Sequence, residues 1–290
     1  MKYQNFLLLI TTLLLGISFS SCDSTTAETN QQSVSQEEIQ EVLIKENLVE
    51  VFQNIVDSNQ VIGSILIYDA QKNEYFSNDF ERAETGFLPA STFKVPNSMI
   101  GLETGILEGE NHLFKWDGEP RRMNIWEKDL TLAEAYKASC VPCYQEIARK
   151  VGTKRMNEHL KKFEYGNMEI ADSMIDIFWL EGEFKISQKQ QIDFLKRFYN
   201  ESLSITEKTY ATMRKIMIID ENEEYTLSGK TGWAIRNGNN IGWFIGFVEK
   251  DDKVYYMATN VMPLDQENTN DFARIRLRIG LDALEQLSIL

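Results

Sequence analysis

A serine and a lysine stand three residues apart in the segment Leu88-Pro-Ala-Ser-Thr-Phe-Lys94. If this segment is helical, the side chains of Ser91 and Lys94 lie on one face, within reach of each other. A serine hydroxyl becomes an effective nucleophile only when a nearby base accepts its proton. Lysine can be that base where an apolar pocket disfavours its ammonium form. The pair therefore predicts nucleophilic catalysis, although S-x-x-K alone also occurs by chance in helices whose lysine is solvated.

Two further short motifs suit the same chemistry. Lys230 and Thr231 have a glycine on either side, and glycine lets another molecule approach a strand backbone closely. A cation next to a hydroxyl suits an anionic group of a substrate. Ser139 lies where one predicted helix stops and Pro142 opens the next, because proline favours the first helical position. On position alone, the pattern favours the competing interpretation, a structural serine at a helix end.

The composition limits the kinds of site that the chain can form. Its 290 residues include 30 Lys and Arg but 44 Asp and Glu, and this net charge of −14 argues against a nucleic-acid partner. With two histidines in the chain, neither a multi-histidine metal site nor a Ser-His-Asp triad is expected. Three cysteines cannot form a four-thiolate zinc site. We therefore expect no metal, and a base other than imidazole.

The amino terminus has the pattern of an export signal. Lys2 precedes an apolar run from Phe6 to Ile17, and small residues follow it. The stretch Phe19-Ser-Ser-Cys22 resembles a bacterial lipoprotein cleavage box, which implies that Cys22 is lipidated. We expect a signal peptide over residues 1–21, export to the periplasm, and a membrane anchor on Cys22.

The remaining sequence predicts a short tether and one large domain. Residues 22–34 are nearly all small or polar, which is typical of a flexible tether, and the domain then covers 35–290. A capping box at Ser35 and Glu38 predicts a helix. Its buried stripe would contain four apolar residues, which are Ile39, Val42, Leu43 and Val49.

The order of the predicted elements is strands, helices, strands and a last helix. A strand is predicted at 62–68, a helical stretch from about 92 to 198, a hairpin at 241–261 and a helix at 274–287. Capping residues mark helix starts, namely Thr131 with Glu134, Ser187 with Gln190, and Thr153. We expect an α+β fold, in which both chain ends form one antiparallel sheet with flanking helices and a helical lobe is inserted between them.

The three motifs are more specific together than singly. S-x-x-K at 91–94, S-x-V at 139–141 and K-T-G at 230–232 occur in that order. S-x-x-K and K-T-G are typical of penicillin-recognising serine enzymes. From about residue 50 to its end the chain resembles the class D (oxacillinase-type) serine β-lactamases. The supporting segments are 88–97, 114–118, 126–131, 165–167, 178–182 and 230–233.

The resemblance implies a catalytic role for several residues. Ser91 would form an acyl-enzyme, and Lys94 would be carboxylated by CO₂ (N6-carboxylysine) and act as general base, with no separate cofactor. Trp179 would donate its indole N–H to that carbamate, or it is simply a core aromatic. Ser139 would relay a proton to the lactam nitrogen, and Lys230 would support it electrostatically.

The resemblance also implies how the substrate is held. Backbone amides of Ser91 and Trp233 would form the oxyanion hole. Thr231 and an arginine of the last helix would bind the substrate carboxylate, and counting back from the C-terminus favours Arg276 over its rival Arg274. Val141, Gly232 and the Trp233 side chain complete the expected substrate site. The expected partners are β-lactam antibiotics, which are penicillins and also cephalosporins or carbapenems.

The remaining candidate groups have simpler interpretations. Cys140 and Cys143 form a C-x-x-C motif outside any thioredoxin-like context, so they are interpreted first as packing cysteines and second as a local disulfide. His112 and His159 are expected to be solvated.

Three other functions compete with hydrolysis. A sensor that stays acylated would need membrane-spanning segments, and no apolar run after residue 21 is long enough. A cell-wall transpeptidase would usually have Asn where Val141 stands. A non-catalytic lipid-anchored binding protein would have no use for the serine and lysine motifs.

Overall fold

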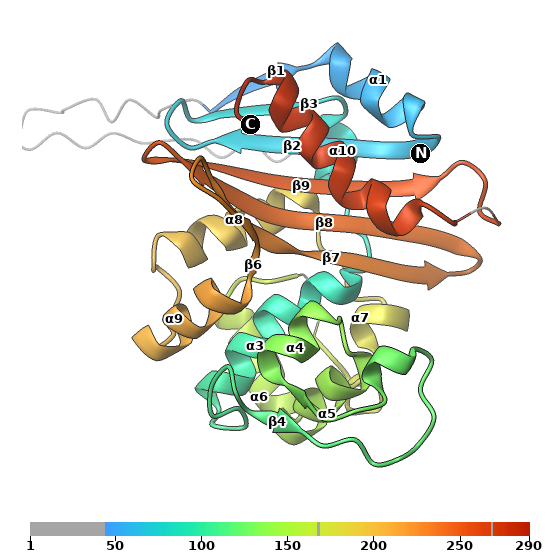
Figure 1. Cartoon of the computed structure of the whole chain (residues 1–290), viewed down its shortest axis with the longest axis vertical. Coiled ribbons are helices and arrows are strands. Elements are labelled where there is room, and N and C mark those ends of the chain that lie inside the picture. Colours follow the sequence, from blue (N-terminus) through green and yellow to red (C-terminus); the bar gives the residue numbers. More distant parts are fainter. Residues whose placement is uncertain (1–43, 167–168, 268) are drawn as a thin grey trace, which may run out of the picture. The chain divides into compact units, whose positions relative to one another are not determined.

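The computed structural model describes residues 44–166, 169–267 and 269–290. Its centre is a seven-stranded sheet. In spatial order the strands are β1 (Lys45–Leu48), β3 (Glu74–Ser77), β2 (Val61–Asp69), β9 (Lys253–Pro263), β8 (Asn239–Lys250), β7 (Thr226–Arg236) and β6 (Ile218–Glu221) (Figure 1). Neighbours are antiparallel except β1 and β3, which are parallel.

The two ends of the chain meet in the middle of this sheet. Strand β2 pairs with β9 along its whole length, from Val61 opposite Pro263 to Asp69 opposite Tyr255. The predicted fold class, a sheet made by both chain ends with an inserted helical lobe, is therefore confirmed. The predicted hairpin is also confirmed, because β8 and β9 turn at Asp251 and Asp252, both with positive φ.

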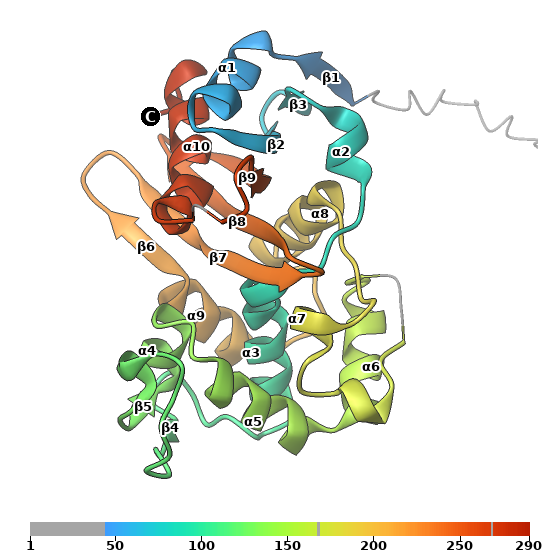
Figure 2. The same cartoon turned by 90° about the vertical axis from the view of Figure 1, so that its right-hand side faces the viewer.

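Helices cover both faces of the sheet (Figure 2). Helices α1 (Glu50–Ser58) and α10 (Phe272–Gln286) pack on one face. The other face contacts α2 (Phe80–Glu84), α7 (Phe178–Glu181) and α8 (Gln188–Tyr199). Side chains alternate along β2 accordingly, with Ile65 and Ile67 in the α1–α10 core and Leu66 and Tyr68 in the other core.

The helical lobe is inserted between β3 and β6. Its long helices are α3 (Lys94–Glu103), α5 (Val141–Val151), α6 (Thr153–Lys162) and α9 (Glu207–Ile216). Shorter pieces connect them, which are the 3₁₀ turns Ala90–Phe93, Asn124–Trp126 and Asp172–Met174, strands β4 (Leu113–Phe114) and β5 (Leu130–Thr131), and helix α4 (Leu132–Lys137). Helix α3 contacts α5, α6 and α9, so it forms the centre of the lobe.

Local signals set most of the helix starts in the lobe. Thr131 and Ser187 each accept a hydrogen bond from the backbone three residues on, and both predicted capping boxes are confirmed. Thr153 is the first residue of α6 rather than its cap, because Gly152 occupies the cap position with φ of 77°. That left-handed conformation favours glycine.

The predicted helix after Ser35 is wrong at its far end. Residues Lys45–Leu48 form strand β1, and α1 begins only at Glu50, so Val49 does not belong to a buried helical stripe. The reason is a tertiary contact, since β1 pairs with β3. Ile39, Val42 and Leu43 lie outside the described residues, as do the expected signal peptide at 1–21, Cys22 and the tether at 22–34. No helix of the described segments could span a membrane.

Candidate active site

Ser91 and Lys94 lie at the junction between a 3₁₀ turn and α3. The turn Ala90–Phe93 holds the serine, and the lysine is the first residue of the helix. Lys94 Nζ donates a hydrogen bond to Ser91 Oγ at 3.0 Å. Ala90 has a positive φ of 52°, which costs about 1–2 kcal/mol for a residue other than glycine. The chain therefore holds the residue before the serine in a strained conformation.

Lys94 is buried without a carboxylate partner. Its side chain is 1% exposed, and among the described residues no acid forms an ion pair with it. Burial, and then the positive charge of Lys230, lower the pKa of Lys94 well below its ordinary value. The Tyr144 ring, 4.9 Å from Nζ, favours the ammonium by about 0.5–2 kcal/mol. Desolvation of a buried ion costs several kcal/mol. Burial therefore shifts the equilibrium of Lys94 toward the neutral amine, compared with a lysine in solvent.

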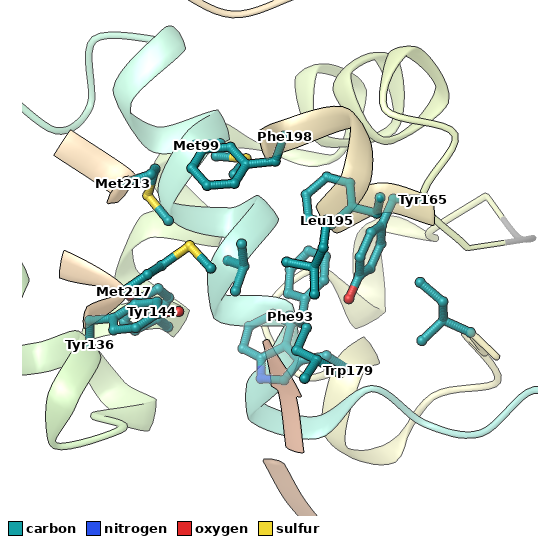
Figure 3. Packing of buried hydrophobic residues seen from close by; sticks show 14 of the residues in the cluster. Phe93, Met99, Tyr136, Tyr144, Tyr165, Trp179, Leu195, Phe198, Met213 and Met217 are labelled. Atoms are coloured by element: carbon teal, nitrogen blue, oxygen red, sulfur yellow. The ribbon is translucent and has the colours of Figure 1, made fainter. Parts of the chain in front are cut away.

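Trp179 packs against Phe93, the residue before Lys94, and carries a donor that is not used. Its indole stacks on Phe93, with ring centroids 5.4 Å apart and planes at 19° (Figure 3). The indole Nε1 is buried and has no hydrogen-bond partner within the described part of the chain. A buried donor without an acceptor is costly, so this N–H is free to bind an additional group.

Lys230 lies in β7, which runs beside the serine turn. Its Nζ donates to the Thr231 carbonyl at 2.9 Å. Burial, and then the charge of Arg276, lower the pKa of Lys230 to about 7. Gly232 allows the close approach, because a Cβ there would lie 3.0 Å from the carbonyl oxygen of Pro89, in the chain just before the serine.

The two candidate arginines of α10 have different surroundings. Arg276 is 8% exposed and donates to the carbonyls of Gly232 and Ala273. Its guanidinium also lies 5.4 Å from the centroid of the Trp233 ring, and burial lowers the pKa of Arg276 to about 10. Arg274 pairs with Asp271, and its side chain is 83% exposed. The structure thus brings Arg276, and not Arg274, to the K-T-G strand.

Ser139 sits in the turn between α4 and α5 with a positive φ of 53°. On one side, Tyr136 donates to the carbonyl of Gly229, next to Lys230, at 3.2 Å. On the other, Tyr144 shares a 2.7 Å hydrogen bond with Ser98 of α3. The turn is thereby attached to both elements that carry the other motifs.

Neither of these two tyrosines belongs to one of the three sequence motifs. The apolar stripe of α5, which includes Tyr144, indicates burial, but periodicity cannot show which hydroxyl a tyrosine will meet. Val141 is the first residue of α5 and is half-buried. The Trp233 indole donates to Asn240 Oδ1 at 2.8 Å on the neighbouring strand.

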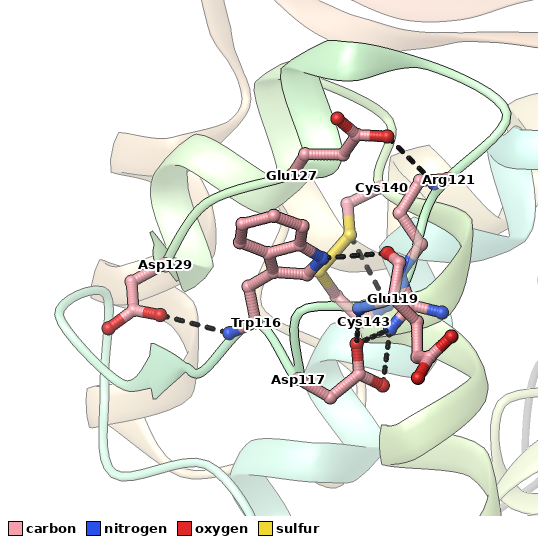
Figure 4. Close-up of polar contacts among 8 residues, drawn as sticks. All are labelled: Trp116, Asp117, Glu119, Arg121, Glu127, Asp129, Cys140 and Cys143. Atoms are coloured by element: carbon pink, nitrogen blue, oxygen red, sulfur yellow. Dashed lines mark hydrogen bonds and ion pairs between the residues drawn. A yellow bond between two sulfur atoms is a disulfide. The ribbon is translucent and has the colours of Figure 1, made fainter.

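Cys140 and Cys143 form a disulfide, with Cα atoms 5.5 Å apart. The first interpretation, two packing cysteines, is therefore wrong, and the alternative of a local disulfide is correct. Spacing could not decide between them, because both require the same burial and the same one-turn separation. Figure 4 draws the disulfide together with the polar contacts of the loop 115–129. In that loop Arg121 pairs with Asp117 and its amide donates to Glu127.

The expectation of solvated histidines is wrong in part for His159, which is half-buried. Its Nδ1 is buried and has no partner among the residues that the structure describes, and burial lowers its pKa. Its ring packs edge-on against Phe163, in the core of the lobe. His112 is half-buried and packs against Phe114. In the described ranges no cluster of three or more His, Cys, Asp or Glu side chains could hold a metal ion.

Comparisons with known proteins agree with this arrangement. The family model of the penicillin binding protein transpeptidase domain matches residues 56–275. β-Lactamase OXA-48 of Klebsiella pneumoniae is 39% identical over 229 residues, which is 79% of this chain and 84% of that protein. β-Lactamase OXA-10 of Pseudomonas aeruginosa is 42% identical over 211 residues, or 72% of this chain and 79% of that one.

A solved structure shows the same similarity in three dimensions. The class D β-lactamase from Sebaldella termitidis superimposes with a TM-score of 0.80 at 37% identity, covering 85% of this chain and 98% of that one. Sequence identity of this size over most of both chains, together with the shared fold, establishes the relationship. This chain belongs to the class D serine β-lactamase family.

Proposed function

We propose that the protein hydrolyses the amide bond of β-lactam antibiotics through an acyl-enzyme on Ser91. One observation carries the proposal, namely the 3.0 Å contact between Ser91 Oγ and the buried amine of Lys94. An amine with a strongly lowered pKa next to a serine hydroxyl is the arrangement that serine activation needs. Membership of the β-lactamase family supplies the substrate class.

We further propose that Lys94 is carboxylated. A neutral amine reacts with CO₂ to give a carbamate and a proton, and burial favours the neutral form of the Lys94 amine by lowering its pKa. The Trp179 indole N–H fits the product, because it is a buried donor that needs an acceptor. Once formed, the carbamate supplies an anionic oxygen that can accept protons from a hydroxyl or from water.

In acylation, Ser91 Oγ attacks the lactam carbonyl carbon while the base on Lys94 takes the hydroxyl proton. The Oγ–carbon bond forms and the carbon–nitrogen bond of the ring breaks. Ser139 gives its proton to the departing nitrogen and takes up the proton that the base received from Ser91, and a positive charge on Lys230 would support that transfer. Backbone amides of Ser91 and Trp233 stabilise the oxyanion.

In deacylation, the same base takes a proton from water, and the water oxygen attacks the ester carbon. The bond from that carbon to Ser91 Oγ breaks, and the serine regains its proton. One base therefore serves both half-reactions.

The substrate carboxylate is held by Thr231 and the Arg276 guanidinium, whose place beside β7 suits this task. Val141, Gly232 and Trp233 make the remaining contacts with the substrate. Penicillins are the primary substrates in this proposal. Export through residues 1–21 to the periplasm, and membrane attachment through a lipid on Cys22, are supported by the sequence pattern alone.

A turnover assay tests the hydrolase proposal. The full chain should convert many equivalents of a chromogenic cephalosporin, and Ser91→Ala should convert none. A single stoichiometric burst would refute the hydrolase and favour a sensor or transpeptidase. An absence of any acylation would favour a non-catalytic binding protein.

A bicarbonate experiment tests the carboxylated lysine. Activity lost in acidic, CO₂-free buffer should return when bicarbonate is added at neutral pH. Trp179→Phe keeps the aromatic ring but removes the indole N–H, so it should need more bicarbonate for the same activity and lose about tenfold or more in kcat. If bicarbonate never changes the rate of a decarbonated sample, the base is the amine itself.

A further inference from the structure

The turn that carries Ser139 is fixed from both sides. Before the serine, the Ala138 carbonyl accepts a hydrogen bond from Trp126 Nε1 at 3.0 Å. After it, the Cys140 amide donates to the Ala135 carbonyl at 2.9 Å. Ser139 itself has the left-handed φ of 53°, a conformation that a serine does not adopt readily. Such a conformation persists only when the surroundings hold it.

The Cys140–Cys143 disulfide is the covalent part of these surroundings. Cys140 is the N-terminal cap of α5, and its Sγ accepts the Cys143 amide at 3.2 Å. The bond joins the residue directly after Ser139 to the first turn of the helix. Both cysteines are buried, so the bond lies inside the lobe rather than on its surface.

Helix α5, whose first turn contains Cys143, is also attached to α3, the helix that begins at Lys94. Tyr144, the residue after Cys143, bonds to Ser98 through its hydroxyl and accepts a 3.2 Å hydrogen bond from Asn97 at its carbonyl. Helix α5 is thus tied to α3, which begins at Lys94. A continuous path of bonds leads from α3 through the disulfide to Ser139.

We propose that the Cys140–Cys143 disulfide positions Ser139 for proton transfer to the lactam nitrogen. This inference rests on the proposed function, in which Ser139 acts during acylation. Cys140 and Cys143 are positioning residues, because they touch the turn and not the substrate. Val141 lies between them, so the same bond fixes one wall of the expected substrate site.

The test uses the full chain with Cys22→Ser, which leaves Cys140 and Cys143 as its remaining cysteines. Dithiothreitol gives two electrons and two protons to the disulfide, producing two protein thiols and its own cyclic disulfide. A thiol count then distinguishes the oxidised chain from the reduced one. The readout is kcat/KM for a chromogenic cephalosporin, because this constant includes every step through acylation. The enzyme concentration is the number of active sites titrated with a fluorescent penicillin.

The reduced chain should lose about tenfold to a hundredfold in kcat/KM, because a misplaced catalytic group is costly. Reoxidation should restore it, and Cys140→Ala with Cys143→Ala should be equally slow and insensitive to dithiothreitol. In a Ser139→Ala background, reduction should change kcat/KM by less than about twofold, since the disulfide acts through that serine. Ile65→Ala, in β2, controls for a general loss of stability.

Each other outcome overturns the inference. A reduced chain with two counted thiols and full kcat/KM would show that the bond does not position the serine. An equal loss in the Ser139→Ala background would assign its effect to another residue. A reduced chain that unfolds, seen by circular dichroism, would make the bond a requirement of the fold. If the oxidised chain itself turns over neither a penicillin nor the cephalosporin, the proposed function fails first, and the inference fails with it.

Discussion

The buried cations on the two faces of the central sheet differ in their hydrogen-bond acceptors. On the α10 face, the Arg276 guanidinium donates to three backbone carbonyls, those of Phe272, Ala273 and Gly232. On the lobe face, Lys94 donates to a single serine hydroxyl. Hydrogen-bonded donors stabilise the charged form of a buried cation, whereas burial with few acceptors lowers the pKa of an amine.

The hydrophobic cores on the two faces of the sheet also differ in the side chains that form them. The α1–α10 core is built mainly from aliphatic side chains and phenylalanines, among them Phe52, Ile65 and Leu284. The lobe core places the Tyr144 ring 4.9 Å from Lys94 Nζ and leaves the Trp179 N–H without an acceptor in the described part of the chain. We infer that the α1–α10 core contributes mainly stability. The lobe core contains an unfavourable polar arrangement, and that arrangement is reactive.

Lys94→Met should have the largest effect, and it should change activity and stability in opposite directions. Loss of the base should lower kcat by about a thousandfold to ten-thousandfold. In decarbonated buffer the same change should raise Tm by about 2 °C or more, because it replaces a buried amine by an apolar chain of similar volume. Steady-state kinetics and thermal unfolding measure both effects.

The pH dependence of that gain provides a control. Burial makes the pKa of Lys94 lower in the folded chain than in the unfolded one, so the folded chain binds fewer protons. Wild-type stability therefore rises with pH above the folded pKa, until the unfolded amine has also lost its proton. The advantage of Lys94→Met should shrink from neutral to alkaline pH. A Tm gain that grows with pH would contradict this account of the lobe face.

Ile65→Ala, in the α1–α10 core, should lower stability and leave activity unchanged. Ile65 is fully buried in the α1–α10 core, so its truncation should lower the unfolding free energy by about 2–5 kcal/mol. Because β2 carries none of the candidate site residues, kcat/KM per titrated site should not change. Ile65→Val is the graded control, with an expected loss of about 0.5–1.5 kcal/mol. An equal loss of activity would mean that the two faces are not separable.

Arg276→Ala and Arg274→Ala form a matched pair on one helix. Removing the buried guanidinium should raise KM by about tenfold to a hundredfold, since it removes hydrogen bonds from a charged group to the substrate carboxylate. Arg274 pairs with Asp271 in solvent, so its loss should change KM by less than about twofold. Similar effects of both substitutions would remove Arg276 from the substrate site.

The smallest expected effect is a pH dependence from Lys230. Burial lowers its pKa to about 7, so the ammonium loses its proton as the pH rises through neutrality. The substrate carboxylate then loses one nearby positive charge, and KM should increase by about threefold to fivefold between pH 6 and pH 8.5. Lys230→Arg, which stays charged, should remove this dependence. A KM that falls with pH would contradict the sign.

The sequence determined the site more fully than it determined the edges of the fold. The S-x-x-K spacing predicts the Ser91–Lys94 contact, because one helical turn is enough to bring the two side chains together. Capping boxes and the β8–β9 hairpin are equally local. Strand β1 was missed because its pairing with β3 joins residues almost thirty positions apart, and no periodicity within residues 45–48 reports it.

Other features depend on groups that meet only in three dimensions. Nothing in the sequence distinguishes Arg276 from Arg274 by environment; the difference arises from which side of α10 faces β7. The contacts of Tyr136 with β7 and of Tyr144 with α3 have the same origin. The half-buried position of His159 follows from its ring contact with Phe163, whereas most of its neighbours in sequence are polar.

The pairing of β2 with β9 has a consequence for the order of folding. Strand β2 is synthesised early, but its partner and α10 come from the end of the chain. Until the ribosome has released these last elements, β2 has an unpaired edge and the sheet has no centre. The sheet can therefore form only after β9 has left the ribosome. A premature stop codon before β9 removes the sheet as well as Arg276, so truncated products are expected to be degraded rather than partly active.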